Sequence, residues 1–126
     1  PGDTMALPLL QQATALRNSQ SALERSQGVI NTYGIIDAMR ANVIEARAGR
    51  YALSKTCAAP TAPAPSASLE AKDVYFWLSN MQKNLGDGAC GAITCTGNRC
   101  VVTAEWSDTR GGANVQALKF ETEVVL

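Results

Sequence analysis

The feature that most constrains this chain is a long stretch, residues 9–59, that contains no proline. At its start a leucine or isoleucine stands at every seventh position: Leu9, Leu16, Leu23 and Ile30. We therefore predict one continuous helix from about residue 7 to about residue 42. About 35 residues span roughly 50 Å at 1.5 Å per residue, more than the diameter of a domain of this size. The N-terminal half must then project, which leaves Leu9 and Leu16 exposed in the monomer.

Two glycines, Gly28 and Gly34, lie inside the predicted helix. Each costs about 1 kcal/mol relative to alanine in a helix. They could allow a bend or a close approach between helices. We favour a third interpretation, in which both face the sheet and let a strand come near.

The middle of the chain, residues 43–68, has no sustained period and is expected to be a loop. Its three prolines, Pro60, Pro63 and Pro65, exclude helix and sheet there and favour an extended, solvated segment. A second, shorter helix is predicted over residues 69–85, where apolar residues recur at helical offsets. Its stripe consists of Val74, Trp77, Leu78, Met81 and Leu85. Ser68 can cap its start.

The last part, residues 89–126, is expected to be a three-stranded antiparallel meander. The Gly97-Asn98 pair predicts a hairpin in which Cys95 lies opposite Cys100 and Ile93 opposite Val102. The whole chain is then one α+β domain of 126 residues. Pro1–Met5, which shows no pattern, is set aside as a cloning remnant. The predicted core is Ile30, Tyr33, Ile36, Trp77, Leu78, Ile93, Val102, Trp106, Leu118 and Phe120.

The four cysteines indicate disulfides and an oxidising compartment rather than a zinc site, because their spacing is wrong for zinc and no histidine is present. Cys95 and Cys100 would face each other in the hairpin, within reach of a disulfide. Cys90 points to the other face of a regular strand, which leaves it for Cys57. The two other pairings stay open, since a bulge near Gly91 would turn Cys90 around.

Composition also narrows the function. Lys+Arg and Asp+Glu are equal at 11 each, so no basic excess exists to bind nucleic acid. The absence of histidine removes the commonest general base. Ser54 and Lys55 are adjacent and so do not face one another as a catalytic dyad would. We therefore expect no enzyme activity, no cofactor and no metal.

Four segments resemble the PilV family of type IV minor pilins. They are residues 16–27 (LRNSQSALERSQ), 33–42 (YGIIDAMRAN), 49–51 (GRY) and 102–110 (VTAEWSDTR). The run from Asp37 to Asn42 is the most specific, and the resemblance covers about residues 9–125. It implies a long N-terminal helix packed on a small antiparallel sheet. It also implies a leader, a cleavage site, a methylated N-terminal residue and an apolar helix ahead of this sequence, so we expect the chain to be the soluble ectodomain.

The resemblance further implies a role without catalysis. The full protein would sit in the inner membrane, with a periplasmic ectodomain, and then join other minor pilins in a complex at the pilus tip. That complex primes polymerisation of the major pilin and associates with a tip adhesin. The expected assembly surface comprises the helix stripe, the loop at 58–68 and the turn at 108–114. The residues singled out in it are Leu9, Ala13, Leu16, Asp108, Arg110 and Asn114.

Two alternatives remain. The first is a pseudopilin of a type II secretion system, which has the same long helix packed on a small sheet. The major pseudopilin binds calcium through clustered acidic residues in its C-terminal loop, whereas the corresponding loop here has only Asp108, which argues against this alternative. The other alternative is a small secreted, disulfide-bonded binding domain. The sequence upstream of Leu7 would separate them: a prepilin leader and an apolar helix, or an ordinary signal peptide.

Overall fold

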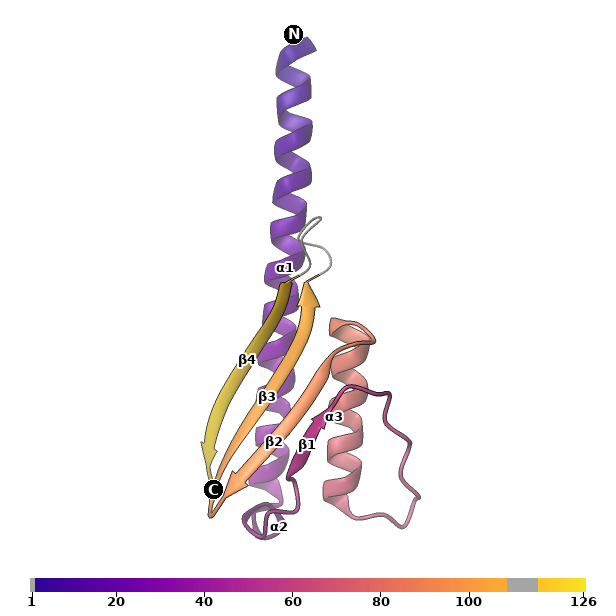
Figure 1. Ribbon diagram of the computed structural model, residues 1–126, viewed down its shortest axis with the longest axis vertical. Helices are drawn as coiled ribbons and strands as arrows, with labels where there is room; N and C mark the ends of the chain where they lie inside the picture. Colours follow the sequence, from indigo (N-terminus) through magenta and orange to yellow (C-terminus); the bar gives the residue numbers. More distant parts are fainter. Residues whose placement is uncertain (1, 109–115) are drawn as a thin grey trace.

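The computed structural model describes residues 2–108 and 116–126, with the side chains of residues 9–107 and 117–126. It is an α+β domain with one long helix, two shorter helices and four strands (Figure 1). In chain order these are α1 (Gly2–Ala41), α2 (Val43–Arg47), β1 (Leu53–Thr56), α3 (Leu69–Leu85), β2 (Cys90–Thr96), β3 (Arg99–Asp108) and β4 (Gln116–Val125).

Helix α1 is continuous, as the proline-free stretch predicts, and runs through Gly28 without a break. It begins at Gly2, so it includes most of the opening segment that the sequence argument set aside. Its C-terminal half contacts α3, β3 and β4, whereas its N-terminal half rises clear of the sheet (Figure 1). Among the residues described, no helix combines the length and the apolar character that crossing a membrane requires.

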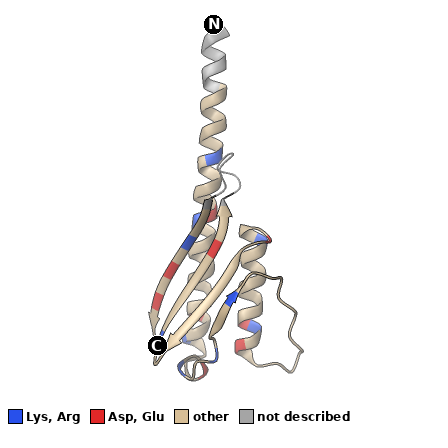
Figure 2. Ribbon diagram, viewed as in Figure 1, with Lys and Arg blue, Asp and Glu red and all other residues tan. Residues whose placement is uncertain are grey.

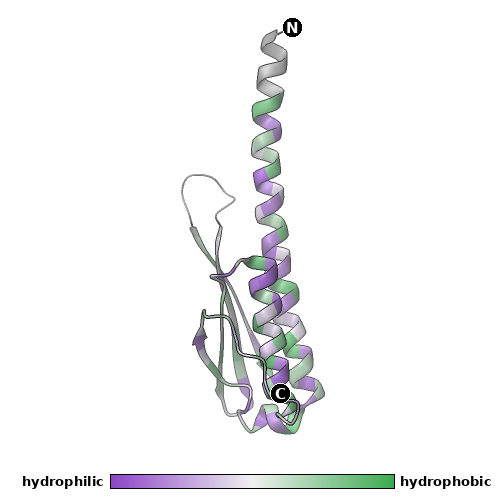
Figure 3. Cartoon of the chain, turned by 90° about the vertical axis from the view of Figure 1, so that its right-hand side faces the viewer, coloured by the Kyte–Doolittle hydropathy of each residue, from purple (hydrophilic) through white to green (hydrophobic). Residues whose placement is uncertain are grey.

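The sheet is antiparallel in the order β1-β2-β3-β4, so it has four strands, not the three expected. The additional strand β1 lies in the segment predicted to be a loop, and Leu53 pairs with Ile93 at its start. It is four residues long and its exposure does not alternate, so it leaves no period-2 signal in the sequence. Helices α1 and α3 lie together on one side of the sheet (Figure 3).

The hairpin register is confirmed: Cys95 pairs with Cys100 and Ile93 with Val102. Strand β4 continues the sheet beside β3, where Trp106 pairs with Leu118. Six of the predicted core residues are buried: Ile36, Trp77, Leu78, Ile93, Val102 and Trp106. Leu118 and Phe120 are partly buried against them.

Two core predictions are wrong, because the helix turns a different face to the sheet. Ile30 is 62% exposed and Tyr33 50% exposed. The face that packs inward carries Glu24, Gly28, Thr32, Ile35, Ile36 and Met39, all buried. Residues two apart in a helix point about 160° away from each other. Since Thr32 is fully buried, Ile30 must face solvent.

The two helix glycines also lie on different faces of α1. A Cβ built on Gly28 would lie 2.7 Å from the ring of Trp106, so at this position the helix and β3 approach too closely for any side chain. A Cβ on Gly34 would meet nothing within 4 Å. The prediction that both glycines face the sheet therefore holds for Gly28 and is wrong for Gly34.

Candidate assembly surface

The predicted stripe lies on the exposed side of α1. Leu9, Leu16, Leu23 and Ile30 are 64%, 60%, 56% and 62% exposed, and Ala13 is exposed as well. An apolar side chain left this open gains little from its own fold. Four such residues aligned on one helix form an apolar line, which we call the α1 stripe.

The projecting part of α1 also carries little charge. Residues 9–16 contain no Lys, Arg, Asp or Glu, and Arg17 is the first charged side chain of the described stretch (Figure 2). The polar residues among them are neutral, such as Gln12 and Thr14. Burying neutral polar groups that can find hydrogen bonds costs much less than burying ions. This part of the helix is therefore suited to being covered by another apolar helix.

A polar cluster fixes the C-terminal end of α1 to α3. The hydroxyl of Tyr51, a residue with no exposed surface, donates to Asp73 Oδ2 at 2.6 Å. Asn42 Nδ2, just after α1, donates to the Tyr51 oxygen at 3.2 Å and to Glu70 Oε2 at 3.4 Å. Burial, together with the hydrogen bond to Asp73, raises the pKa of Tyr51 from 10.0 to about 12. The pKa of Glu70 is lowered, chiefly because its own backbone N–H donates to the carboxylate.

The two expected disulfides, Cys57–Cys90 and Cys95–Cys100, are present and account for all four cysteines. The first ties the start of the proline-rich loop to β2. The loop then follows α3 rather than the sheet, on the side of α3 away from α1 (Figure 1). Gln82 Nε2 donates to the Ala58 carbonyl at 3.0 Å, and Lys72 Nζ to the Pro65 carbonyl at 2.8 Å.

The outer face of the sheet is charged and solvated. Lys55 pairs with Glu105 and Arg99 with Glu123, each at 2.7 Å. Exposed pairs of this kind contribute little stability. Of the predicted turn residues, Asp108 ends β3. Its side chain, and the whole of Arg110 and Asn114, lie outside the described residues.

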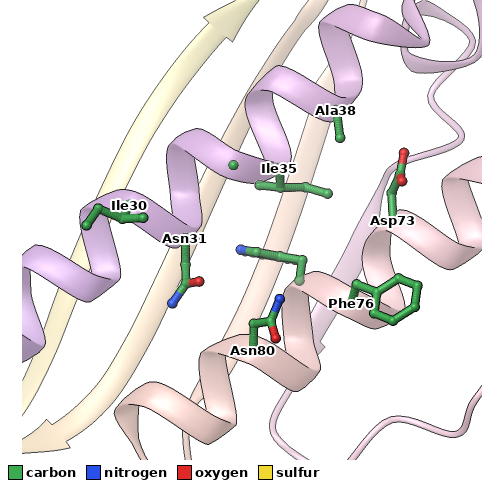
Figure 4. Close-up of a pocket in the computed structure, with 9 residues that line it drawn as sticks. Ile30, Asn31, Ile35, Ala38, Asp73, Phe76 and Asn80 are labelled. Carbon is green, nitrogen blue, oxygen red and sulfur yellow. The ribbon is translucent and has the colours of Figure 1, made fainter.

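A groove between α1 and α3 was not anticipated from the sequence. It has a volume of about 330 Å³, and its lining includes Ile30, Gly34, Asp73, Phe76 and Trp77. Figure 4 shows Ile30 and Asn31 on α1 across from Phe76 and Asn80 on α3. Phe76 is 59% exposed and lies off the apolar stripe of α3. An aromatic residue outside the apolar stripe was the one feature of the sequence that could have indicated this groove. The α1 stripe ends at this groove, because Ile30 belongs to both.

The described residues contain no group of three or more Cys, Asp or Glu side chains placed to hold a metal ion. The surfaces described above are the α1 stripe, the apolar groove between α1 and α3 and the charged outer face of the sheet. Comparisons with protein-family models, with curated proteins and with solved structures found no match to this chain.

Proposed function

We propose that this protein is a non-enzymatic minor pilin of a type IV pilus, of the PilV type, and that it acts in the tip complex that starts pilus assembly. The observation that carries the proposal is the α1 stripe, which is exposed on a helix that extends beyond the end of its own sheet (Figure 1). A helix of this length, with a neutral projecting half, is built to be buried by other helices.

Three further features support this role. The resemblance of residues 16–27 and 33–42 to PilV sequences covers the helix itself. The two disulfides agree with an oxidising compartment such as the periplasm. The Tyr51 cluster joins the end of the helix to α3, and the contact between Gly28 and Trp106 joins the helix to the sheet. Other minor pilins, the major pilin and a tip-associated adhesin are the partners that this role requires.

The proposal is tested by complementation in the native host. Deleting the gene should lower the number of pili per cell, and the wild-type gene should restore it. Leu16→Glu places a charge in the α1 stripe and should fail to restore piliation. Asn18→Glu is the matched control, because Asn18 is exposed and lies about 160° around the helix from Leu16.

Two results would contradict the proposal. Normal piliation in the deletion strain would remove the protein from pilus assembly. A loss of type II secretion with normal piliation would assign it to the pseudopilins.

A further inference from the structure

We propose that Thr61, in the middle of the proline-rich loop, is the acceptor of an O-linked sugar. The loop is taken as residues 57–68, which include Pro60, Pro63 and Pro65. The inference does not depend on the pilus role, because it follows from the composition, the backbone and the exposure of this loop.

A hydroxyl is glycosylated only where it and the backbone around it fit into the active site of a transferase. Serines and threonines within helices and strands are held by the backbone hydrogen bonds of those elements. Of the exposed serine and threonine side chains that the structure describes, all lie in α1 or in a strand except Thr61, Ser66 and Ser68. The described hydroxyls that are both exposed and outside regular structure are therefore all in the loop.

Two of these three residues lie where the loop is fixed to α3. Ser68 caps the helix, and its Oγ accepts from the Ala71 N–H at 3.3 Å. Ser66 lies in a turn with Pro65, whose carbonyl accepts from Lys72 Nζ at 2.8 Å. Neither serine can move into an enzyme without breaking these contacts.

Thr61 lies in the part of the loop that is not fixed. Gln82 binds the carbonyl of Ala58 on one side of it, and the contact with Pro65 lies on the other. Between them, residues 61–64 belong to no helix, strand or turn. The side chain of Thr61 is exposed, and its hydroxyl makes no hydrogen bond within the described part of the chain. Thr61 is therefore the hydroxyl that a transferase can reach.

The prolines also prepare the backbone on both sides of Thr61. Pro60 and Pro63 have fixed φ angles, and the alanine before each is restricted to extended conformations. An extended segment without internal hydrogen bonds can enter a cleft without unfolding the domain, and it loses less entropy than a flexible chain would. Serine and threonine among prolines are the composition of O-glycosylated segments.

The surroundings of Thr61 favour a sugar over a phosphate. The loop from 57 to 68 contains no charged residue, so a kinase that recognises its substrates by charge finds nothing to bind there. The two disulfides are typical of compartments outside the cytosol, whereas a kinase uses the ATP of the cytosol.

The reaction needs a sugar diphosphate as donor and a transferase that holds it. Thr61 Oγ1 attacks the anomeric carbon of the sugar and forms the new C–O bond. The bond from that carbon to the phosphate oxygen breaks, and the diphosphate leaves with the electron pair. A base of the transferase takes the hydroxyl proton. No atom is oxidised or reduced.

The position of the loop keeps this modification apart from the α1 stripe. The loop lies on the side of α3 away from α1, so a sugar on Thr61 would leave the stripe uncovered (Figure 1). The sugar and the pilus role can therefore fail independently.

Mass spectrometry of the full-length protein purified from its native host tests the proposal. After reduction, alkylation and digestion with trypsin, one peptide, residues 56–72, contains all the hydroxyls of the loop. Its mass should exceed that of the unmodified peptide by a whole number of sugar residues, and electron-transfer fragmentation should place the increment on Thr61. The same chain made by cell-free synthesis without sugar donors should lack it. A peptide from the native host without any increment, or with that of a phosphate, overturns the proposal.

Three variants expressed in the native host test the acceptor. Thr61→Ala should lose the increment completely, whereas Thr61→Ser, which keeps a hydroxyl, should retain it. Thr94→Ala is the matched control, because Thr94 is an exposed threonine held in β2, and it should be modified as the wild type is. An increment that persists on peptide 56–72 in Thr61→Ala overturns the assignment to Thr61.

Discussion

Residues 9–19 and residues 24–39 belong to the same helix, yet only the second stretch has a face that is buried by its own fold. The projecting half exposes its leucines, whereas the packed half buries Glu24, Gly28 and Thr32. The sheet comes so close to the packed half that Gly28 fits against Trp106 only because it has no side chain. The packed half therefore buries small and polar residues alongside Ile35, Ile36 and Met39, whereas the apolar stripe stays exposed and available to another molecule.

The largest loss of stability is expected when the Trp106 ring, on which the packed half rests, is removed. Trp106→Ala removes a ring that is 4% exposed and packs on Gly28. We expect the free energy of unfolding in urea to fall by about 3–5 kcal/mol. A midpoint equal to that of the wild type would mean that the helix does not rest on this ring.

The two glycines should respond with opposite signs. Gly28→Ala places a methyl group 2.7 Å from the Trp106 ring and should lower the free energy of unfolding by about 1–3 kcal/mol. Gly34→Ala meets no neighbour and should raise it by up to about 1 kcal/mol, because alanine favours the helix. The same sign for both would contradict the close approach at Gly28.

The polar cluster around Tyr51 should make the free energy of unfolding depend on pH in the alkaline range. The pKa of Tyr51 is raised from 10.0 to about 12 in the folded protein, so the folded state binds its proton more tightly than the unfolded state does. This contribution is complete below pH 10 and is lost as the pH rises through 12. Urea unfolding at pH 9 and at pH 11.5 should therefore show a loss of stability that is smaller in Tyr51→Phe. An equal loss in both proteins would mean that Tyr51 is not the group responsible.

The projecting half should tolerate change in the isolated chain. Leu9→Ala and Leu16→Glu alter residues that are 64% and 60% exposed. The free energy of unfolding should change by less than about 0.5 kcal/mol in either variant. A larger loss would mean that the stripe packs within its own fold.

Local pattern was enough to predict the long helix, α3, the hairpin register and the Cys95–Cys100 disulfide. In each of these, residues close in sequence decide the outcome: Gly97 sets the turn, and the turn sets Cys95 opposite Cys100. The Cys57–Cys90 disulfide joins residues 33 apart, and its partners were predicted only by elimination. The exposure of Leu9 and Leu16 followed from length alone, because a helix longer than its domain must project.

The helix face, β1 and the groove could not be predicted in this way. A seven-residue period identifies apolar positions but does not say which molecule covers them, so Ile30 and Tyr33 were assigned to the core. Strand β1 forms because Cys57 and Leu53 meet β2 in three dimensions, which no local signal reports. The groove depends on where Gly34 and Phe76 fall when α1 and α3 pack.

The central claim is that the α1 stripe contacts another pilin, and cross-linking tests it most directly. The four native cysteines are all paired, so Leu16→Cys introduces a single thiol, with Asn18→Cys as the control on the opposite side of the helix. Each variant is expressed in piliated cells together with a neighbouring pilin that carries a second thiol on its helix, and the cells are treated with a bifunctional maleimide. Leu16→Cys should give a cross-linked pair with that pilin, and Asn18→Cys should not. Equal cross-linking from both positions, or none from Leu16→Cys, would contradict the claim.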